Sequence, residues 1–152
     1  MPRDQYDGCV YHGSNTSAPA TDRLLLKTSQ SSDAAGATSD DSLFFNDTEP
    51  TTTVFSVGTR KHANSNGGMI AFVFADVEGF SKFGGYTGND SSNGTFVYTG
   101  FKPAWIMLKY TSGSAGGTKN WIIYDNKRSP QNPNDNTVFA NTNEAESADS
   151  SF

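Results

Sequence analysis

The chain has 152 residues, a length that suits one domain with a modest core. Its net charge of −5 and pI of about 4.8 argue against a nucleic-acid partner, because phosphate binding requires a basic patch. The single cysteine, Cys9, excludes an intrachain disulfide, and no segment has the roughly 20 apolar residues of a membrane-spanning helix, so membrane insertion is not expected.

The composition predicts an all-β protein. Only 34% of the residues are hydrophobic, and the 15 glycines and six prolines, with many Ser, Thr, Asn and Asp residues, indicate turns between short strands. Nine strands and no helix are expected, at residues 9–12, 23–28, 53–57, 69–75, 80–87, 95–99, 104–110, 121–125 and 137–141. We therefore predict one antiparallel β-sandwich over residues 1–152, of the jelly-roll or concanavalin-like kind.

Two of these segments carry more detailed predictions. Residues 69–75 read Met-Ile-Ala-Phe-Val-Phe-Ala, which is continuously apolar and therefore typical of a central strand covered on both faces. Residues 80–101 are expected to form a β-hairpin, in which Asn93-Gly94 supplies the two residues that tolerate a positive φ.

The two ends of the chain resemble each other. Tyr11 and Tyr124 each follow a short apolar run, and they lie 113 residues apart. At the same offset, Leu25-Leu26 falls on Val138-Phe139. A fixed period is typical of units built in series, so the domain is expected to hold one repeat unit and, from about residue 121, the start of a second.

Longer runs of the sequence resemble a known family module. They are residues 48–58, 70–75, 78–89, 96–109 and 121–125. Together they resemble a repeat module of uncharacterised function from virion and tail-associated proteins of tailed bacteriophages, particularly marine ones. The resemblance implies a virion structural protein, made in the cytoplasm of a bacterial host. It implies no catalytic residues, because the family has none agreed.

The chemistry of the side chains gives little support to an enzyme. His12 and His62 are the only imidazoles, and neither lies in a motif with a nucleophilic Ser or Cys. Among the acidic residues, four could supply a glycosidase pair: Asp76, Glu78, Asp125 and Asp135. The loop at residues 132–136 has oxygen ligands but not the spacing of a calcium-binding EF-hand. No catalytic residue, metal site or cofactor is therefore predicted.

Aromatic residues are the stronger functional signal. They make up 12% of an otherwise polar chain, and a small core cannot enclose all of them. Trp105 and Trp121 lie inside apolar strands and are expected in the core. Exposed tyrosines beside asparagines can stack on sugar rings or bury at subunit contacts. The candidate residues for a glycan site or a subunit contact are Tyr86, Asn89, Asn93, Tyr98 and Tyr110.

Three function classes stay open from the sequence. The leading one is a virion structural protein of a tail fibre, spike or capsid decoration, which acts by assembling with copies of itself and with other virion proteins. The second is a host-attachment adhesin that binds a bacterial surface glycan, and the third is a glycan hydrolase. In the first, strands from a neighbouring copy would complete a sheet edge.

Overall fold

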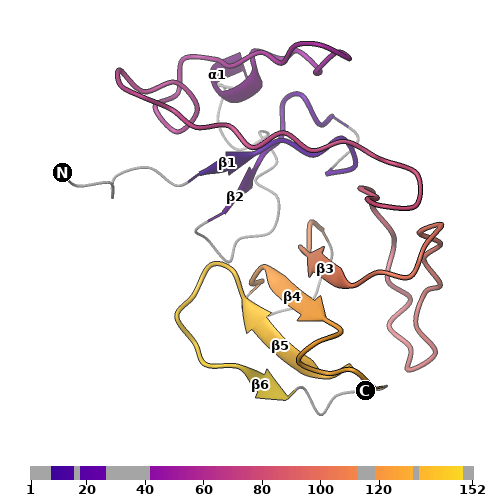
Figure 1. Ribbon diagram of the computed structural model, residues 1–152. Coiled ribbons are helices and arrows are strands. Elements are labelled where there is room, and N and C mark those ends of the chain that lie inside the picture. The colour runs from indigo at the N-terminus through magenta and orange to yellow at the C-terminus, as the bar shows by residue number, and fades with distance from the viewer. Residues whose placement is uncertain (1–7, 16–17, 27–41, 113–118, 132–133, 149–152) are drawn as a thin grey trace.

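The computed structural model describes residues 8–15, 18–26, 42–112, 119–131 and 134–148. The described residues form six short strands and one turn of helix. Long coils connect these elements (Figure 1). The strands form two antiparallel sheets, one of two strands and one of four. The predicted all-β, sandwich-like class is therefore confirmed.

The two-stranded sheet lies near the N-terminus and supports a small apolar cluster. It pairs β1 (Cys9–Val10) with β2 (Leu24–Leu25). The helix α1 (Ser42–Phe45) lies above it in Figure 1 and buries Phe44 and Phe45. The ring of Tyr11 packs edge-on against Phe45, and the guanidinium of Arg23 lies 3.9 Å above the ring of Phe44. These contacts form because the short helix presents two adjacent aromatic rings to the sheet.

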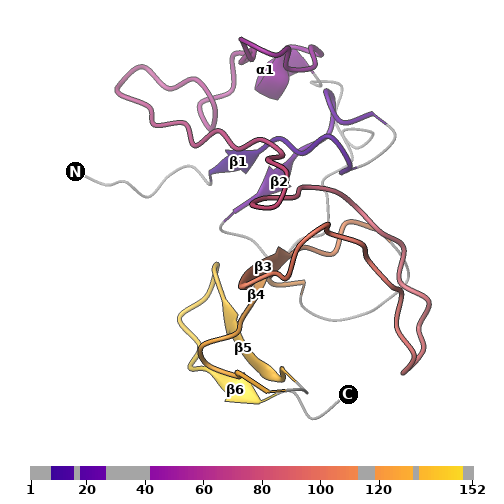
Figure 2. The same ribbon diagram turned by 45° about the vertical axis from the view of Figure 1, so that its right-hand side comes forward.

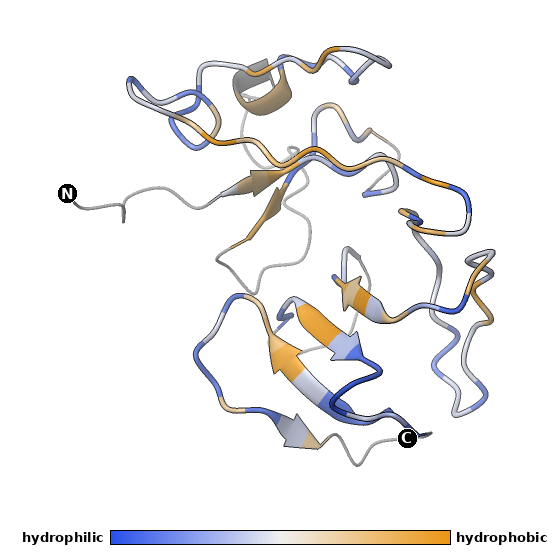
Figure 3. Cartoon of the chain, in the orientation of Figure 1, coloured by the Kyte–Doolittle hydropathy of each residue, from blue (hydrophilic) through white to orange (hydrophobic). Residues whose placement is uncertain are grey.

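The four-stranded sheet holds the C-terminal third of the described chain. Its order follows the sequence: β3 (Trp105–Leu108), β4 (Ile122–Asp125), β5 (Asn136–Phe139) and β6 (Ser147–Ala148). Every neighbouring pair is antiparallel. The apolar residues of β3, β4 and β5 give these strands their orange colour in Figure 3.

Trp121 connects the two sheets. It lies just before β4, is 7% exposed, and donates its indole N–H to the carbonyl oxygen of Leu25 in β2. The view in Figure 2 shows the two sheets one above the other. The expected core position of Trp121 is thus correct, whereas that of Trp105 is wrong, because its side chain is 56% exposed at the edge of the second sheet.

The strand predictions hold at the two ends of the described chain and fail in its middle. The ends contain β1 to β5 within or across the predicted ranges, and β6 and α1 were not anticipated. Residues 53–57, 69–75, 80–87 and 95–99 form no strand. A strand requires a partner with which to form a ladder, and among the described residues these segments form none, although their composition suits a strand. Ser81 makes only an isolated bridge to Val77.

The prediction of a central strand at residues 69–75 is wrong in this structure. Ile70 and Phe72 are 83% and 81% exposed, and Val73 and Phe74 are similarly open. The continuous apolar run predicts cover on both faces, but no sheet layer within the described chain provides it. Figure 3 shows this apolar stretch on an open coil that runs past β1.

The structure of residues 80–101 also differs from the hairpin predicted from the sequence. Its two arms approach each other, since the hydroxyl of Thr95 donates to the carbonyl oxygen of Thr87 at 2.8 Å, but they form no ladder. The turn residue with a positive φ is Asp90, at 52°, whereas Asn93 and Gly94 do not adopt one. Aspartate adopts a positive φ more readily than most residues, because its short polar side chain can form hydrogen bonds to the nearby backbone.

Candidate functional site

The most unusual surface of the protein is the open apolar coil in its middle. We call residues 69–75 the open segment. Its residues 69–74 make no hydrogen bond to any described residue, and its large side chains are mostly exposed. Among the described residues, the segment's one hydrogen bond runs from the hydroxyl of Ser81 to the carbonyl oxygen of Ala75, at 2.8 Å. The open segment therefore has the composition of a buried strand but lacks both its cover and its ladder.

Other exposed apolar side chains lie on the coils around it. They include Val54, Phe55, Phe80, Phe96 and Val97, and Ile106 of β3 is exposed as well. Phe74 and Phe83 pack against each other with ring centroids 5.8 Å apart, so the open segment has one aromatic neighbour. Large exposed apolar surface is rare on monomeric proteins and marks contact with another molecule.

The structure brings four of the five predicted site residues into one loop region. The side-chain amide of Asn89 donates to the carbonyl oxygen of Asn93 at 2.9 Å, and its Oδ1 accepts from the N–H of Ser91 at 3.3 Å. Tyr86 and Tyr98 lie on the two arms and are 54% and 79% exposed. The tyrosine rings are thus open to a ligand, while Asn89 already uses both ends of its amide within the loop.

Tyr110 lies apart from these four residues, beyond the end of β3. The ammonium group of Lys119 lies over its ring, 4.7 Å from the ring centroid. Tyr110 itself is only partly exposed. A cation above the ring face occupies the surface on which a sugar would stack. Tyr110 therefore does not join the loop at residues 86–98 in the arrangement of this structure.

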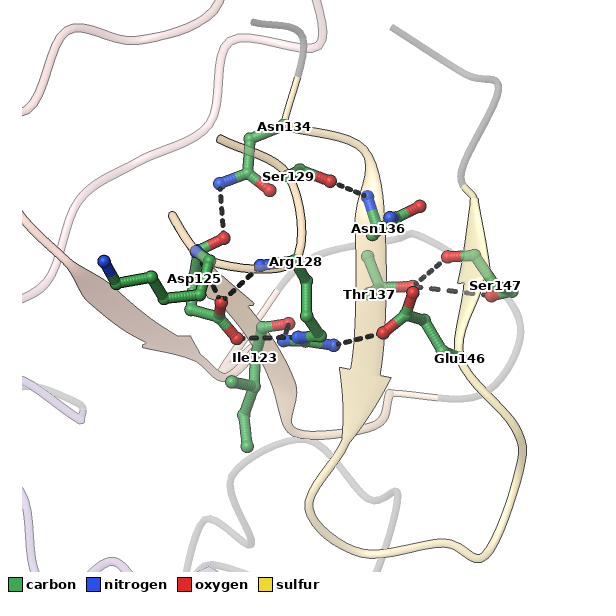
Figure 4. A network of polar contacts seen from close by, with 10 residues as sticks. Ile123, Asp125, Arg128, Ser129, Asn134, Asn136, Thr137, Glu146 and Ser147 are labelled. Carbon is green, nitrogen blue, oxygen red and sulfur yellow. Dashed lines mark hydrogen bonds and ion pairs between the residues drawn. The ribbon is translucent and has the colours of Figure 1, made fainter. Parts of the chain in front are cut away.

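A network of charged and polar groups lies at the end of β4 (Figure 4). Arg128 donates from Nε to Oδ2 of Asp125 at 2.6 Å, and its other nitrogens reach the carbonyl oxygen of Ile123 and Oε2 of Glu146. Asn134 donates to the carbonyl oxygen of Asp125 at 3.2 Å. The network fastens the turn after β4 to residues near β5 and β6.

Asp125 is the centre of this network. The backbone N–H of Arg128, its side chain and the N–H of Lys127 all donate to the Asp125 carboxylate and lower its pKa to about 2. A carboxylate with so low a pKa is an acceptor at neutral pH and cannot serve as a general acid. From the sequence, Asp125 is expected only as a possible catalytic carboxylate, although an Asp followed two and three residues later by basic residues also suits a capped turn.

Three of the other predicted acid–base candidates, Asp76, His12 and His62, are also engaged in local contacts. Lys82 donates to Oδ2 of Asp76 and the N–H of Phe83 to its Oδ1, and both lower the pKa of the Asp76 carboxyl, the lysine bond most. Nδ1 of His12 accepts from the N–H of Ser14 at 3.0 Å. His62 packs its ring 5.7 Å from that of Phe44. These side chains stabilise turns and a core cluster.

The described residues contain neither a metal-binding cluster nor a membrane-spanning helix. No group of three or more His, Cys, Asp or Glu side chains is placed to hold a metal ion there. The helix in that part of the chain has four residues, so it is too short to cross a bilayer.

Comparisons with known proteins yield one match. A family model described as a domain of unknown function (DUF7483) matches residues 3–152. Comparison with curated proteins and with solved structures found no match. The family description names no ligand, partner or reaction, so the functional argument depends on the geometry above.

Proposed function

The chain belongs to the family described as a domain of unknown function (DUF7483), and we propose that it is a structural module that acts by assembling with other subunits. The observation that carries this proposal is the open segment. Phe72 and Phe74 are 81% and 72% exposed, and residues 69–74 have no hydrogen-bond partner among the described residues. Exposed apolar side chains on a segment whose backbone N–H and C=O groups are unused are suited to strand addition.

The proposed setting is the virion of a tailed bacteriophage. It rests on the resemblance of residues 48–58, 70–75, 78–89, 96–109 and 121–125 to a module of virion and tail-associated proteins. Within a virion, a tail fibre, spike or capsid decoration would bury the exposed apolar coils at contacts between its subunits. The partners would be copies of this chain and other virion proteins.

Light scattering over a dilution series tests the assembly proposal. We expect a defined homo-oligomer whose mass falls on dilution only at low protein concentration. A well-folded monomer at every concentration would contradict the proposal. Circular dichroism at each concentration is the control, because it shows whether a small particle is folded.

Glycan binding is the alternative function, and one observation favours it. The exposed rings of Tyr86 and Tyr98 lie on the two arms of a polar loop, which is the composition of a shallow sugar site. Binding of the protein to host-cell glycans, measured by surface adsorption, should then fall with Tyr98→Ala. Phe96→Ala is the matched control because it removes an equally exposed ring from the same arm.

Glycan hydrolysis has less support. A glycosidase requires a carboxylic acid whose pKa is raised so that it can protonate the leaving group. At both Asp76 and Asp125 the pKa is lowered instead, by donated hydrogen bonds. An assay for reducing ends released from host-surface glycan tests this class directly.

A further inference from the structure

The strand pairs β1–β2 and β4–β5 are both antiparallel and can be aligned pair for pair, with the second strand displaced by one residue from the sequence repeat. Cys9 faces Leu25 and Val10 faces Leu24, while Ile122 faces Phe139 and Ile123 faces Val138. The first strands correspond at a shift of 113 residues and the second strands at a shift of 114. The sequence offset had aligned Leu25-Leu26 with Val138-Phe139, so the second strand differs from that alignment by one residue.

The two pairs also have the same hydrogen-bond phase. The N–H of Leu26 donates to the carbonyl oxygen of Gly8, and the N–H of Ala140 donates to that of Trp121. Bonded and non-bonded pairs alternate in an antiparallel ladder, so Cys9 and Ile122 are each non-bonded to their partner strand. The backbone N–H and C=O groups of both residues therefore point toward the outer edge of their pair.

The outer edge of β4 is paired with another strand, whereas the outer edge of β1 is paired with none among the described residues. On the outer edge of β4, Leu108 of β3 faces Ile122. On the corresponding edge of β1, Cys9 makes no backbone hydrogen bond to a described residue. Because the two pairs share this hydrogen-bond phase, the outward backbone groups of Cys9 correspond to those of Ile122, and they suit an apolar strand in the position that β3 has beside β4.

The open segment has the properties of such a strand. Like β3, it is a continuous apolar run, and its backbone groups at residues 69–74 are unused within the described chain. The open segment of the same chain runs past β1 in Figures 1 and 2. Its Phe72 nevertheless remains 81% exposed and forms no hydrogen bond to the edge of β1.

We propose that the open segment of a second copy of this chain adds to the outer edge of β1, and that the two copies do so reciprocally. The inference rests on the proposed assembly function and specifies the surface and the partner. A reciprocal exchange closes as a two-fold dimer, so both open segments and both β1 edges are used. It supplies the missing strand without breaking the pairing of β3 with β4.

The exposed apolar area approaches that of a small dimer interface. At about 200 Å² for a whole aromatic side chain, Phe72 and Phe74 together expose roughly 300 Å². Ile70 and Val73 add to this surface. A reciprocal dimer buries the segment twice, with the edges it covers, and so approaches the roughly 1,200 Å² at which specific interfaces begin.

Disulfide trapping tests the pairing, because Cys9 is the only cysteine of the chain. The single substitutions Ala71→Cys, Phe72→Cys and Val73→Cys each place a second thiol in the chain, at successive positions of the open segment. Facing residues in an antiparallel pair have Cα atoms about 4.5–5.5 Å apart, which a disulfide can span. Burial raises the pKa of the Cys9 thiol, so the oxidation is run at alkaline pH.

We expect a covalent dimer on non-reducing gels. Side chains alternate between the faces of a strand, so the yield at position 72 should differ strongly from that at 71 and 73. Phe96→Cys is the control, because this side chain is equally exposed but lies outside the open segment. The best trapping position should give about tenfold more dimer than this control, since pairing raises the local thiol concentration. Adding Cys9→Ser should remove the product.

Three results would overturn the inference. They are a disulfide within one chain, equal yields at all three positions and the control, or no disulfide. Light scattering on the same reduced samples separates this failure from failure of the proposed function. An oligomer without trapping refutes only this pairing, whereas a folded monomer refutes both.

Discussion

The indole Nε1–H of Trp121 donates a hydrogen bond to the carbonyl oxygen of Leu25 at 3.0 Å. This contact joins residues 96 positions apart and links the two-stranded sheet to the four-stranded one. Leu25 O lies on the edge of β2 that faces away from β1. The bond therefore gives a donor to a carbonyl oxygen at the edge of β2, and it holds the N-terminal and C-terminal parts of the chain against each other.

Trp121→Phe should destabilise the protein. The ring stays apolar, but the Leu25 carbonyl loses its donor, which costs about 1–2 kcal/mol of unfolding free energy. Urea unfolding followed by circular dichroism measures the change. Trp105→Phe is the matched control and should alter the unfolding free energy by less than about 0.5 kcal/mol, because its side chain is 56% exposed. Equal effects of the two substitutions would contradict the linking role of Trp121.

Stability should fall in acid partly through Asp125. Its pKa in the folded protein is about 2, below the ordinary 3.8, so the carboxylate stabilises the fold above pH 3.8 and loses that effect as the pH falls toward 2. Asp125→Asn should therefore be less stable than the natural protein at neutral pH, and the two should converge near pH 2. Urea midpoints measured over this range give the comparison.

Glu144→Gln is the control for the charge change. It removes one negative charge from an exposed side chain, and its urea midpoint should follow that of the natural protein across the same pH range. Parallel curves for Asp125→Asn and the natural protein, with no convergence in acid, would contradict the network in Figure 4.

Gly79→Ala should be destabilising, whereas Gly94→Ala should not. Gly79 has a φ of 72° in the tight turn where Val77 and Ser81 exchange hydrogen bonds. A Cβ in this conformation costs about 1 kcal/mol, although it would meet no atom within 4 Å. Gly94 has no positive φ and the same open space. Denaturant unfolding distinguishes this arrangement from a hairpin that turns at Asn93-Gly94, in which Gly94→Ala would be the costly change.

The C-terminal end of α1 depends on two left-handed residues. Asn46 and Asp47 have φ values of 55° and 47°. Glycine is the preferred residue at such a helix end, so Asn46→Gly should be neutral or stabilising and Asn46→Ala should cost about 1 kcal/mol. Thermal unfolding of the two variants tests the difference. A larger loss with glycine than with alanine would contradict the left-handed assignment.

Phe72→Ser should weaken assembly with little effect on the fold. Its ring is 81% exposed, so the unfolding free energy of the subunit should change by less than about 0.5 kcal/mol. Light scattering should show that the oligomer dissociates at a higher protein concentration. Leu24→Ser is the contrasting variant, because Leu24 is 3% exposed and its loss should unfold the subunit. Unchanged assembly in a folded Phe72→Ser variant would contradict a role for the open segment.

The strands predicted from sequence were correct where short apolar runs have a partner nearby in the chain. β4 and β5 are separated by a short turn region, and β1 and β2 likewise pair with the next apolar run. The exposure of Tyr86 and Tyr98 also follows from their place in a polar, turn-rich stretch. The roles of Arg128 and Glu146 could not be predicted, because they are 18 residues apart and meet only when β4, β5 and β6 align.

The sequence by itself determined the all-β class, because alternating and apolar runs bounded by turn residues are local properties of the chain. Only the tertiary structure decided which of those runs become strands. Residues 69–75 and β4 have similar apolar character, yet β4 lies between two partner strands and the open segment has none among the described residues. Burial of a strand depends on neighbours from elsewhere in the chain or from another molecule, and a local run of residues does not encode their presence.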